Sequence, residues 1–368
     1  MARYDVIILG GGIIGCALAE ELARRGQRVA VLERGTIGSE ASGAAAGILC
    51  SQGDLTGPDA LFEMCQQARR LYPRWIARLQ RRSGIRVDYT QRGVLHLVTT
   101  RRAEQDMLRR ARWQRRLGLR MERWSPSQVR RHEPALDGSY VGGFYMPGEA
   151  EVDNALLMRA LAQACRASGV DVRERESVTN IVVRRQAVRG VKTDQASHDA
   201  PIVVNCLGSW ASMGGAFPIR LPVAPARGQM LAFHGPKGMF RRPMMSDRGY
   251  LVQRRDGRVL VGSTVEIGQG RRALTYEGIR SILCGVRHLT SALDACVFVD
   301  AWAGLRPYSG TGRPLMGQTI IEGLYVATGH FRHGILLAPI TAKIMAELIL
   351  HRRPSFNFSP FSPCRFNT

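Results

Sequence analysis

The hydrophobic pattern opens with an apolar run, a glycine cluster and then apolar residues at helical spacing. Residues 4–9 are rich in Val and Ile, which predicts a strand buried on both faces. Apolar residues recur every three to four positions over residues 14–22, and Gly26 is the predicted end of that helix. A second apolar run covers residues 27–32 and ends at Glu33. The pattern therefore predicts a strand–helix–strand unit.

The glycines of this unit have the spacing of a dinucleotide-binding turn. Gly10, Gly12 and Gly15 form G-x-G-x-x-G, which permits a tight turn, close approach of a pyrophosphate and packing of the helix on the strand. Glu33 ends the second strand, where a carboxylate accepts hydrogen bonds from ribose hydroxyls. The alternative is a tight turn without a ligand. Strand, helix, strand and acid together favour dinucleotide binding.

Two further segments favour FAD over a nicotinamide cofactor. Residues 39–49 (SEASGAAAGIL) are small enough for backbone to lie against a pyrophosphate and a flat ring, although an ordinary loop has a similar composition. Residues 323–350 repeat the strand–turn–helix design, with Gly329 in the turn and a helix starting near Gly334. The positive end of that helix would stabilise negative charge on a reduced flavin.

The middle of the chain predicts a second, antiparallel sheet. Alternating and β-branched segments separated by turn residues predict strands, and a helical run joins them to the first unit. The predicted strands cover residues 92–100, 142–150, 228–234, 249–255 and 258–266, and the helix covers residues 154–167.

The charge is unusual for an ordinary globular composition. The formal net charge is +22, and of 52 basic residues only Lys192, Lys237 and Lys343 are lysine. Residues 101–131 contain eleven arginines interleaved with apolar residues, which predicts an amphipathic helix with a solvated basic face. A nucleic-acid or anionic-membrane partner is the alternative. We expect no specific nucleic-acid binding and only weak association with anionic surfaces.

Cysteine usage and hydropathy indicate a cytoplasmic protein. The eight cysteines are scattered without a C-x-x-C pair, so no metal site or redox motif is predicted. The apolar run at residues 4–9 is short and leads into glycines, which favours a strand over a signal peptide. We expect no transmembrane span, because no run of eighteen uncharged apolar residues occurs.

Several motifs, in order along the chain, resemble those of the D-amino-acid oxidase superfamily of FAD-dependent oxidoreductases. The similarity is greatest to its glycine oxidase branch, which supplies thiazole and thiamine biosynthesis. The resemblance extends to the C-terminus and is weakest over residues 101–131. The motifs are IILGGGIIG, SGAAAGIL, VVNCLGSWA, PVAPARGQML, GLRPYSGTGRPLMG, ATGHFRHGILLAP and the tail FNFSPFSPCRF.

The resemblance implies an α/β fold with a Rossmann-like FAD-binding domain and a second, antiparallel-sheet substrate domain of the D-amino-acid oxidase type. Both domains are then discontinuous, with the active site between them. The FAD-binding domain would comprise residues 1–88, 151–218 and 306–368, and the substrate domain residues 89–150 and 219–305.

The resemblance also implies non-covalent FAD and a set of residues that contact it. The backbone of Val178 would lie near the adenine, and the segment from His330 to Leu336 would close over the pyrimidine end of the flavin. The implied contacts are Gly10, Gly12, Ile13, Ile14, Gly15, Glu33, Arg34, Ala41, Ser42, Ala46, Gly47, Ile48, Val178, His330, Phe331, Arg332, His333, Gly334, Ile335 and Leu336.

Three residues are candidates for substrate binding. The planar fork of Arg306 matches a carboxylate, and Tyr250 could add a phenolic hydrogen bond. Arg332, at the predicted flavin-facing turn, is a candidate for shaping the pocket or attracting anions. An arginine after an apolar strand is otherwise often a structural ion-pair member, and a strand tyrosine usually packs.

The reaction implied by the resemblance is oxidation of glycine or another small amino acid to an imino acid. A hydride would pass from Cα to flavin N5, so no side chain need act as acid or base, and His330 and His333 are interpreted as flavin-shell or packing residues. Hydrolysis would give glyoxylate and ammonia, and O2 would be reduced to H2O2. We expect a homo-oligomer. The alternatives are a dehydrogenase that passes electrons to a quinone or partner subunit, and a flavin-dependent nucleic-acid-modifying or nucleic-acid-binding protein.

Overall fold

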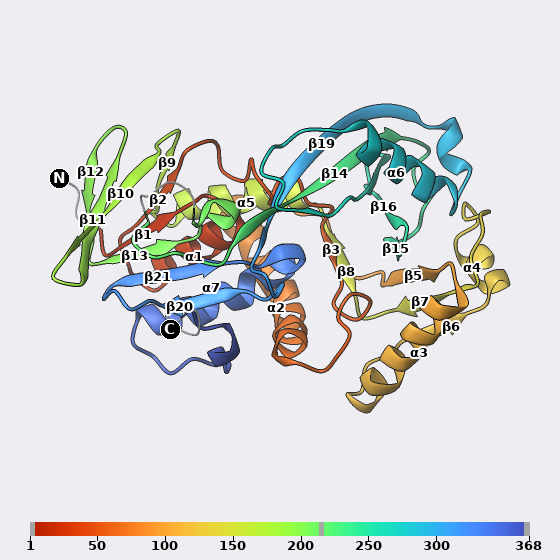
Figure 1. Ribbon diagram of the computed structural model, residues 1–368, viewed down its shortest axis with the longest axis horizontal. Helices are drawn as coiled ribbons and strands as arrows, with labels where there is room; N and C mark the ends of the chain where they lie inside the picture. Colours follow the sequence, from red (N-terminus) through yellow and green to blue (C-terminus); the bar gives the residue numbers. More distant parts are fainter. Residues whose placement is uncertain (1–3, 213–216, 364–368) are drawn as a thin grey trace.

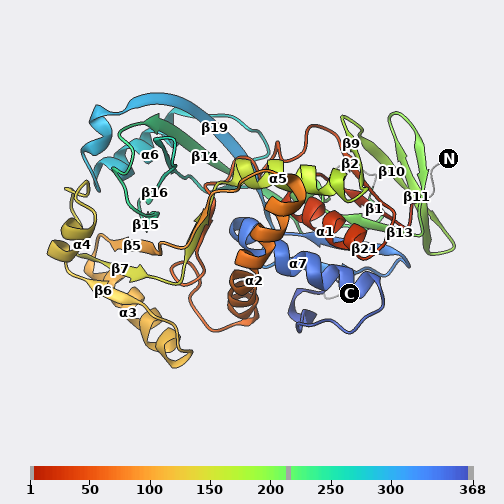
Figure 2. The same cartoon turned by 180° about the vertical axis from the view of Figure 1, so that it is seen from behind.

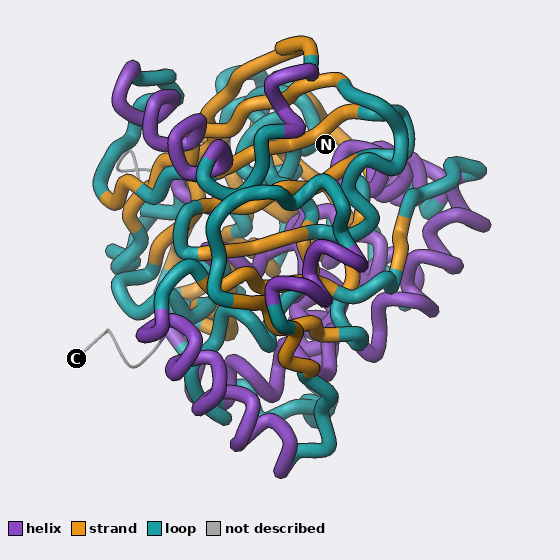
Figure 3. Tube along the Cα trace, turned by 90° about the vertical axis from the view of Figure 1, so that its right-hand side faces the viewer, coloured by secondary structure: helices purple, strands orange, loops and turns teal. Residues whose placement is uncertain are grey.

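The computed structural model describes residues 4–212 and 217–363. Two groups of elements lie side by side along the longest axis (Figure 1). One group is built on a mainly parallel sheet with helices packed on it, and the other on a larger, mainly antiparallel sheet. Viewed along that axis, most strands lie in the interior and most helices toward the outside (Figure 3).

The first sheet is the predicted nucleotide-binding sheet. Its strand order is β20-β21-β13-β1-β2-β9, and all neighbours are parallel except β20 and β21. The strand β1 is wholly buried, as the apolar run predicts. The bounds are β1 (Val6–Leu9), β2 (Val29–Glu33), β9 (Asp171–Glu174), β13 (Ile202–Asn205), β20 (Leu315–Gln318) and β21 (Leu324–Thr328).

Each face of this sheet has its own hydrophobic core. Val6 and Ile8 of β1 pack among four helices, which lie together in Figure 2, whereas Ile7 and Leu9 face a three-stranded hairpin sheet. Burial on both faces explains why β1 is continuously apolar. The helices are α1 (Ile13–Arg24), α2 (Ala60–Ser83), α5 (Asn154–Ala167) and α7 (Gly334–Ile349), and the hairpin sheet contains β10 (Val178–Arg184), β11 (Ala187–Thr193) and β12 (Ser197–Asp199).

The second sheet contains nine strands in the order β18-β14-β17-β16-β15-β5-β7-β6, with β19 also paired to β14. The strands are β5 (Val94–Val98), β6 (Glu122–Trp124), β7 (Gly142–Met146), β14 (Ala224–His234), β15 (Met244–Ser246), β16 (Gly249–Gln253), β17 (Arg258–Gly262), β18 (Glu266–Ile267) and β19 (Val297–Tyr308). The predicted strands pair antiparallel, as expected, whereas β15, which was not predicted, pairs with β5 in parallel. No hairpin joins β5 to β15, so no short turn fixes the direction of one strand relative to the other.

A small third sheet lies where the two groups meet (Figure 1), and the sequence did not predict it. It has the order β3-β8-β4, with β3 (Ile48–Leu49), β4 (Tyr89–Thr90) and β8 (Ala150–Val152). The single strand predicted over residues 142–150 is therefore two strands, because a turn interrupts it before β8. The strand predicted over residues 258–266 likewise ends at Gly262.

The prediction of one helix over residues 101–131 is wrong. The segment forms α3 (Arg101–Arg116), β6 and α4 (Pro126–His132). Gly118 follows the end of α3 and has φ +74°, a conformation that favours glycine. Ser125 is the N-cap of α4 and forms a capping box there. The amphipathic pattern applies to α3 itself, which buries Met107 and exposes most of its arginines. The remaining helix is α6 (Tyr276–Arg287).

Within the described part of the chain, no helix has the length and hydropathy needed to cross a membrane. Seven cysteines there are unbridged thiols. Cys364 and the end of the FNFSPFSPCRF tail lie outside the described residues. The same described residues contain no group of three or more His, Cys, Asp or Glu side chains arranged to hold a metal ion.

Candidate active site

A cavity of about 1040 Å³ lies between the two sheets. Its wall includes every candidate cofactor and substrate residue named from the sequence except Gly15. The cavity volume is at the upper end of the range for small-molecule and cofactor sites, which suits a long ligand. Sequence segments 10–14, 33–54, 176–178, 245–250, 304–307 and 327–336 all contribute to the wall.

The glycine turn after β1 leaves no room for side chains. Gly10 has φ +100°, and a Cβ built there would lie 2.7 Å from the carbonyl oxygen of Cys206. A Cβ on Gly15 would overlap the carbonyl oxygen of Gly10. Gly15 therefore lets α1 pack closely on the turn, as the motif predicts, and it lies behind the cavity wall.

The start of α1 is arranged to receive an anion. Its N-cap, Gly12, offers no side-chain oxygen, and Ser42 Oγ instead accepts a hydrogen bond of 2.9 Å from the N–H of Ile13. The first N–H groups of a helix have no partner within the helix, and the helix dipole adds positive potential there. Since this end of α1 lines the cavity, the turn fits a pyrophosphate.

Glu33 accepts hydrogen bonds from the backbone and also lines the cavity. Its two carboxylate oxygens accept hydrogen bonds of 2.8 Å from the N–H groups of Gly11 and Gly35. A carboxylate has about four lone-pair sites, so acceptor capacity remains for ribose hydroxyls. The neighbouring Arg34 lies 4.0 Å over the ring of Trp210, which also lines the cavity. Glu33 thus shapes the turn in addition to its predicted contact with the ribose.

At the other end of the cavity lies the turn before α7. His330 is buried, and its Nε2 lies 3.1 Å from Thr341 Oγ1. Burial and the nearby His333 lower the pKa of His330 to about 3, so the imidazole is neutral. This environment favours the interpretation of His330 as a packing residue. The N-terminus of α7, at Gly334, reaches the cavity wall, where its dipole would favour negative charge.

Arg306 is a guanidinium without an acidic partner. It lies on β19, where Nη1 donates to the carbonyl oxygen of Thr264 over 3.1 Å and Nη2 to Ser263 Oγ over 2.8 Å. Among the described residues, no Asp or Glu oxygen lies within 4.0 Å of it. Burial lowers the pKa of Arg306, so an unpaired charge here is costly. A ligand carboxylate would satisfy both its charge and its remaining donors.

Tyr250 lies on β16, close to Arg306. Its hydroxyl donates to Met230 Sδ over 2.7 Å, and its proximity opposes the lowering of the Arg306 pKa. Thioether sulfur is a weak acceptor, so a carboxylate oxygen would be a better partner for the hydroxyl. The structure therefore brings Arg306 and Tyr250 to one part of the wall.

Arg332 differs from Arg306 because it has an ion-pair partner. Its Nη1 lies 3.2 Å from Asp54 Oδ1, and His333 Nε2 lies 3.1 Å from Asp54 Oδ2. Burial raises the pKa of Asp54, but the contacts with His333 and Arg332 outweigh this effect and hold the pKa well below its usual range. Asp54 is therefore an ionised acid in the cavity wall.

Sequence reasoning missed several residues of the wall, among them Asp54, Trp210, Ser263 and Thr264. Trp210 follows the carboxyl end of β13, and ligands of parallel sheets bind beyond such strand ends, so its position in the sequence was a usable signal. Asp54, Ser263 and Thr264 lie in irregular segments whose positions depend on the tertiary fold.

The chain is similar to known proteins along nearly its whole length. The model of the FAD dependent oxidoreductase family matches residues 5–348. The chain is 33% identical to a glycine oxidase of Geobacillus kaustophilus over 369 residues, covering 99% of this chain and 97% of that relative. It is 35% identical to the bifunctional protein ThiO/ThiG of Synechocystis sp. over 372 residues, covering 99% of this chain and 54% of that protein. The chain thus spans about half of the bifunctional relative.

The solved structures agree with these relatives. The crystal structure of glycine oxidase from Geobacillus kaustophilus superposes with a TM-score of 0.95 at 32% sequence identity, and the match covers 99% of each chain. The resemblance and the fold class expected from the motifs are confirmed. FAD as the cofactor is confirmed at the level of the family. The individual site residues and the domain boundaries stay predictions.

Proposed function

Because the chain belongs to the FAD-dependent oxidoreductase family, we propose that it is an amino-acid oxidase that deaminates glycine. The single observation that carries the assignment of an amino-acid substrate is the guanidinium of Arg306 in the cavity wall, which has no acidic partner among the described residues. Similarity to a glycine oxidase at 97% coverage of that relative supports the same substrate. Sarcosine and small D-amino acids carry the same carboxylate and are the closest alternatives.

We infer that Arg306 and Tyr250 bind the substrate carboxylate. A guanidinium and a carboxylate form parallel N–H···O bonds, which fix orientation as well as position. The Tyr250 hydroxyl would exchange its Met230 sulfur contact for a carboxylate oxygen. Fixing one end of a molecule as small as glycine restricts where its Cα can lie, which lowers the entropy cost of reaching a reactive geometry.

FAD would be held by the turn at Gly10, by Glu33, by the small residues around Ser42 and by the start of α7. When bound, FAD would supply the two-electron oxidising chemistry for the substrate Cα. No side chain of the described wall is needed as a general base if the amine enters deprotonated. His330 is packed against Thr341, and Asp54 is engaged by Arg332, so neither is free for that role.

The overall reaction balances as glycine, water and O2 giving glyoxylate, ammonia and H2O2. The substrate loses one hydrogen from Cα and one from nitrogen, together with two electrons. O2 receives the two electrons and is reduced to H2O2. We further propose that the product enters thiazole formation in thiamine biosynthesis, since a relative named ThiO/ThiG matches over about half its own length. We also propose a cytoplasmic homo-oligomer. The unbridged cysteines of the described residues support a reducing compartment.

The purified protein tests this function directly. We expect it to be yellow, to release FAD on denaturation, and to consume O2 with glycine while forming glyoxylate and H2O2 in equal amounts. Release of no flavin would contradict the cofactor assignment. Turnover with an artificial quinone but not with O2 would instead identify a dehydrogenase.

A further inference from the structure

Arg254 reaches from the second sheet into the backbone that surrounds the cavity. It follows β16, is only 8% exposed and has its guanidinium among residues of β8, α5 and the segment before β3. Nη1 donates to the carbonyl oxygen of Val152 over 3.1 Å, and Nη2 to that of Ala46 over 2.8 Å. Nη2 also lies 3.1 Å from Asn154 Oδ1. The side chain therefore connects the end of β16 to two segments far from it in the sequence, one at Ala46 and the other from Val152 to Asn154.

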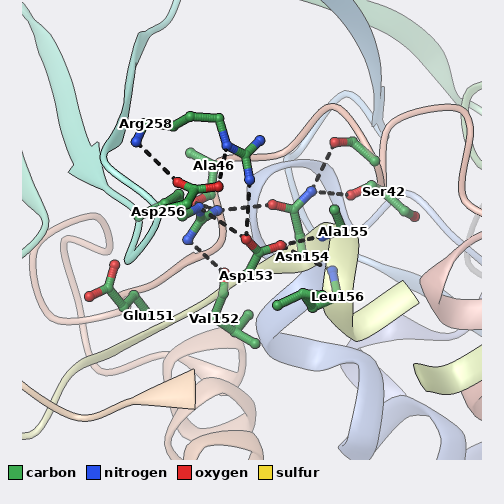
Figure 4. A network of polar contacts seen from close by, with 12 residues as sticks. Ser42, Ala46, Glu151, Val152, Asp153, Asn154, Ala155, Leu156, Asp256 and Arg258 are labelled. Atoms are coloured by element: carbon green, nitrogen blue, oxygen red, sulfur yellow. Dashed lines mark hydrogen bonds and ion pairs between the residues drawn. The ribbon is translucent and has the colours of Figure 1, made fainter. Parts of the chain in front are cut away.

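Asn154 extends the same network toward the cofactor segment. Its Nδ2 donates over 2.9 Å to the carbonyl oxygens of both Ser42 and Gly43. Figure 4 shows Asn154 between Ser42 and Asp153 at the start of α5. Asp153 caps α5 through the N–H groups of its first turn, and its Oδ2 lies 3.7 Å from Arg254 Nε. Asp153 thereby supplies a counter-charge for the buried guanidinium.

These donors hold one side of the segment from Ser42 to Gly47. Trp302 Nε1 donates to the carbonyl oxygen of Ala44 over 3.1 Å, so side-chain donors engage four of its carbonyl groups. A trans peptide directs its N–H opposite to its C=O. Within the described chain, the N–H groups of Ala45 and Gly47 have no hydrogen-bond partner, and both residues line the cavity. The contacts of the carbonyl groups thus leave N–H donors available at the wall.

Gly47 is the point at which this arrangement is tightest. It has φ +71°, and a Cβ on it would overlap the carbonyl oxygen of Val152 and lie 3.2 Å from Arg254 Nη2. Only glycine lets the Ala46–Gly47 peptide lie between the guanidinium and the cavity. The carbonyl of this peptide faces Arg254, so its N–H is directed away from the guanidinium.

We propose that Arg254, assisted by Asn154, is a positioning residue for FAD: it orients the Ala46–Gly47 peptide so that the N–H group binds the cofactor. The inference rests on the family's use of FAD and does not depend on glycine being the substrate. It also links the second sheet to the cofactor segment, because Arg254 directly follows β16 and Ala46 lies in the cofactor segment. Loss of this link should weaken FAD binding before it affects any chemical step.

The test is titration of the apoprotein with FAD, followed by quenching of protein fluorescence. Arg254→Gln should raise the Kd for FAD at least tenfold, and Arg254→Lys should restore only part, because one ammonium cannot hold both carbonyl oxygens. Arg255→Gln is the matched control, since this adjacent side chain is 53% exposed and pairs only loosely with Asp88 at 3.4 Å. Its Kd should stay within twofold of that of the wild type.

Melting temperatures separate positioning from a purely structural role. We expect Arg254→Gln to reduce the rise in Tm that FAD confers, so the holoprotein loses more stability than the apoprotein. Equal losses in both forms, with an unchanged Kd for FAD, would overturn the proposal.

A second variant covers the case in which Arg254→Gln does not fold. Asn154→Asp retains an acceptor for Arg254 but places an oxygen against the carbonyl groups of Ser42 and Gly43, and it should also raise the Kd for FAD. An unchanged Kd in Asn154→Asp would contradict the proposal. If the wild type binds FAD normally but does not oxidise glycine, that result contradicts the proposed function and leaves the proposal for Arg254 standing.

Discussion

Arg332 forms an ion pair with Asp54, with 3.2 Å between Nη1 and Oδ1. The other candidate cation of the cavity, Arg306, has no acidic partner within 4.0 Å among the described residues. A carboxylate that binds Arg332 must compete with Asp54, whereas one that binds Arg306 replaces only neutral acceptors. This difference ranks the two arginines as substrate-binding groups.

Arg332→Ala should therefore affect glycine oxidation only moderately. We expect kcat/KM to fall less than about tenfold, or about 1.4 kcal/mol, because the lost charge is already compensated by Asp54. Steady-state oxygen consumption at several glycine concentrations measures the effect. A loss of a hundredfold or more would place Arg332 on the substrate.

Tyr250→Phe removes one neutral donor from the carboxylate. The expected cost is about 1 kcal/mol, which corresponds to a fivefold rise in KM for glycine by the usual conversion. The control is Tyr276→Phe, because Tyr276 is 82% exposed on α6 and should leave KM unchanged. An unchanged KM in Tyr250→Phe would show that its hydroxyl keeps Met230 as its partner.

His96 should make the protein sensitive to mild acid. Burial lowers the pKa of His96 to about 4, and the charge of Arg110 adds to this effect. In the unfolded chain His96 takes up a proton near pH 6.5, whereas in the native protein it stays neutral at that pH. The contribution of His96 to stability is therefore present above pH 6.5 and is lost as the pH falls toward 4. By pH 5 the loss is about 2 kcal/mol.

His96→Leu should remove this part of the pH dependence. The difference in free energy of unfolding between pH 7 and pH 5, measured by urea denaturation, should be about 2 kcal/mol smaller than in the wild type. The pKa of His330, about 3, predicts a further loss in the same direction that both proteins share. Identical pH profiles for the two proteins would contradict the proposed role of His96.

The basic surface of α3 should not recognise nucleic acid specifically. Arg101 and Arg123 pair with Glu104, and Trp113 packs edge-on against Phe62 with ring centroids 4.7 Å apart. The indole is therefore unavailable as a stacking platform for bases. Filter binding at 150 mM salt should give no sequence preference and no affinity tighter than about 1 µM. Sequence-dependent retention at that salt concentration would refute this.

The parts of the structure that follow from local rules were predictable. The turn from Gly10 to Gly15, the strand ending at Glu33 and the helix over residues 154–167 depend on glycine conformation and apolar periodicity, and all three form as predicted. The break in the helix expected over residues 101–131 was signalled by Gly118 and Pro126, and the spacing of apolar residues concealed it.

The rest depends on contacts between distant segments. Ser263 reaches Arg306 across 43 residues, and Arg254 reaches Ala46 across 208. Neither contact has a periodic signature, because the first requires β17 and β19 to assemble on β14, and the second requires the second sheet to dock on the cofactor segment. The parallel pairing of β15 with β5 is of the same kind, since the sequence between them contains no short turn that fixes direction.

The central claim is that Arg306 holds the carboxylate of glycine. Arg306→Ala should retain FAD, because the residue lies outside both glycine-rich turns, and should lower kcat/KM for glycine at least about a hundredfold, or about 2.7 kcal/mol. Arg306→Lys should recover only part, since an ammonium lacks the planar fork. The most direct measurement is anaerobic reduction of the bound flavin by glycine in Arg306→Ala. We predict reduction only at glycine concentrations far above those the wild type needs; near wild-type apparent affinity would contradict the assignment and place the carboxylate elsewhere.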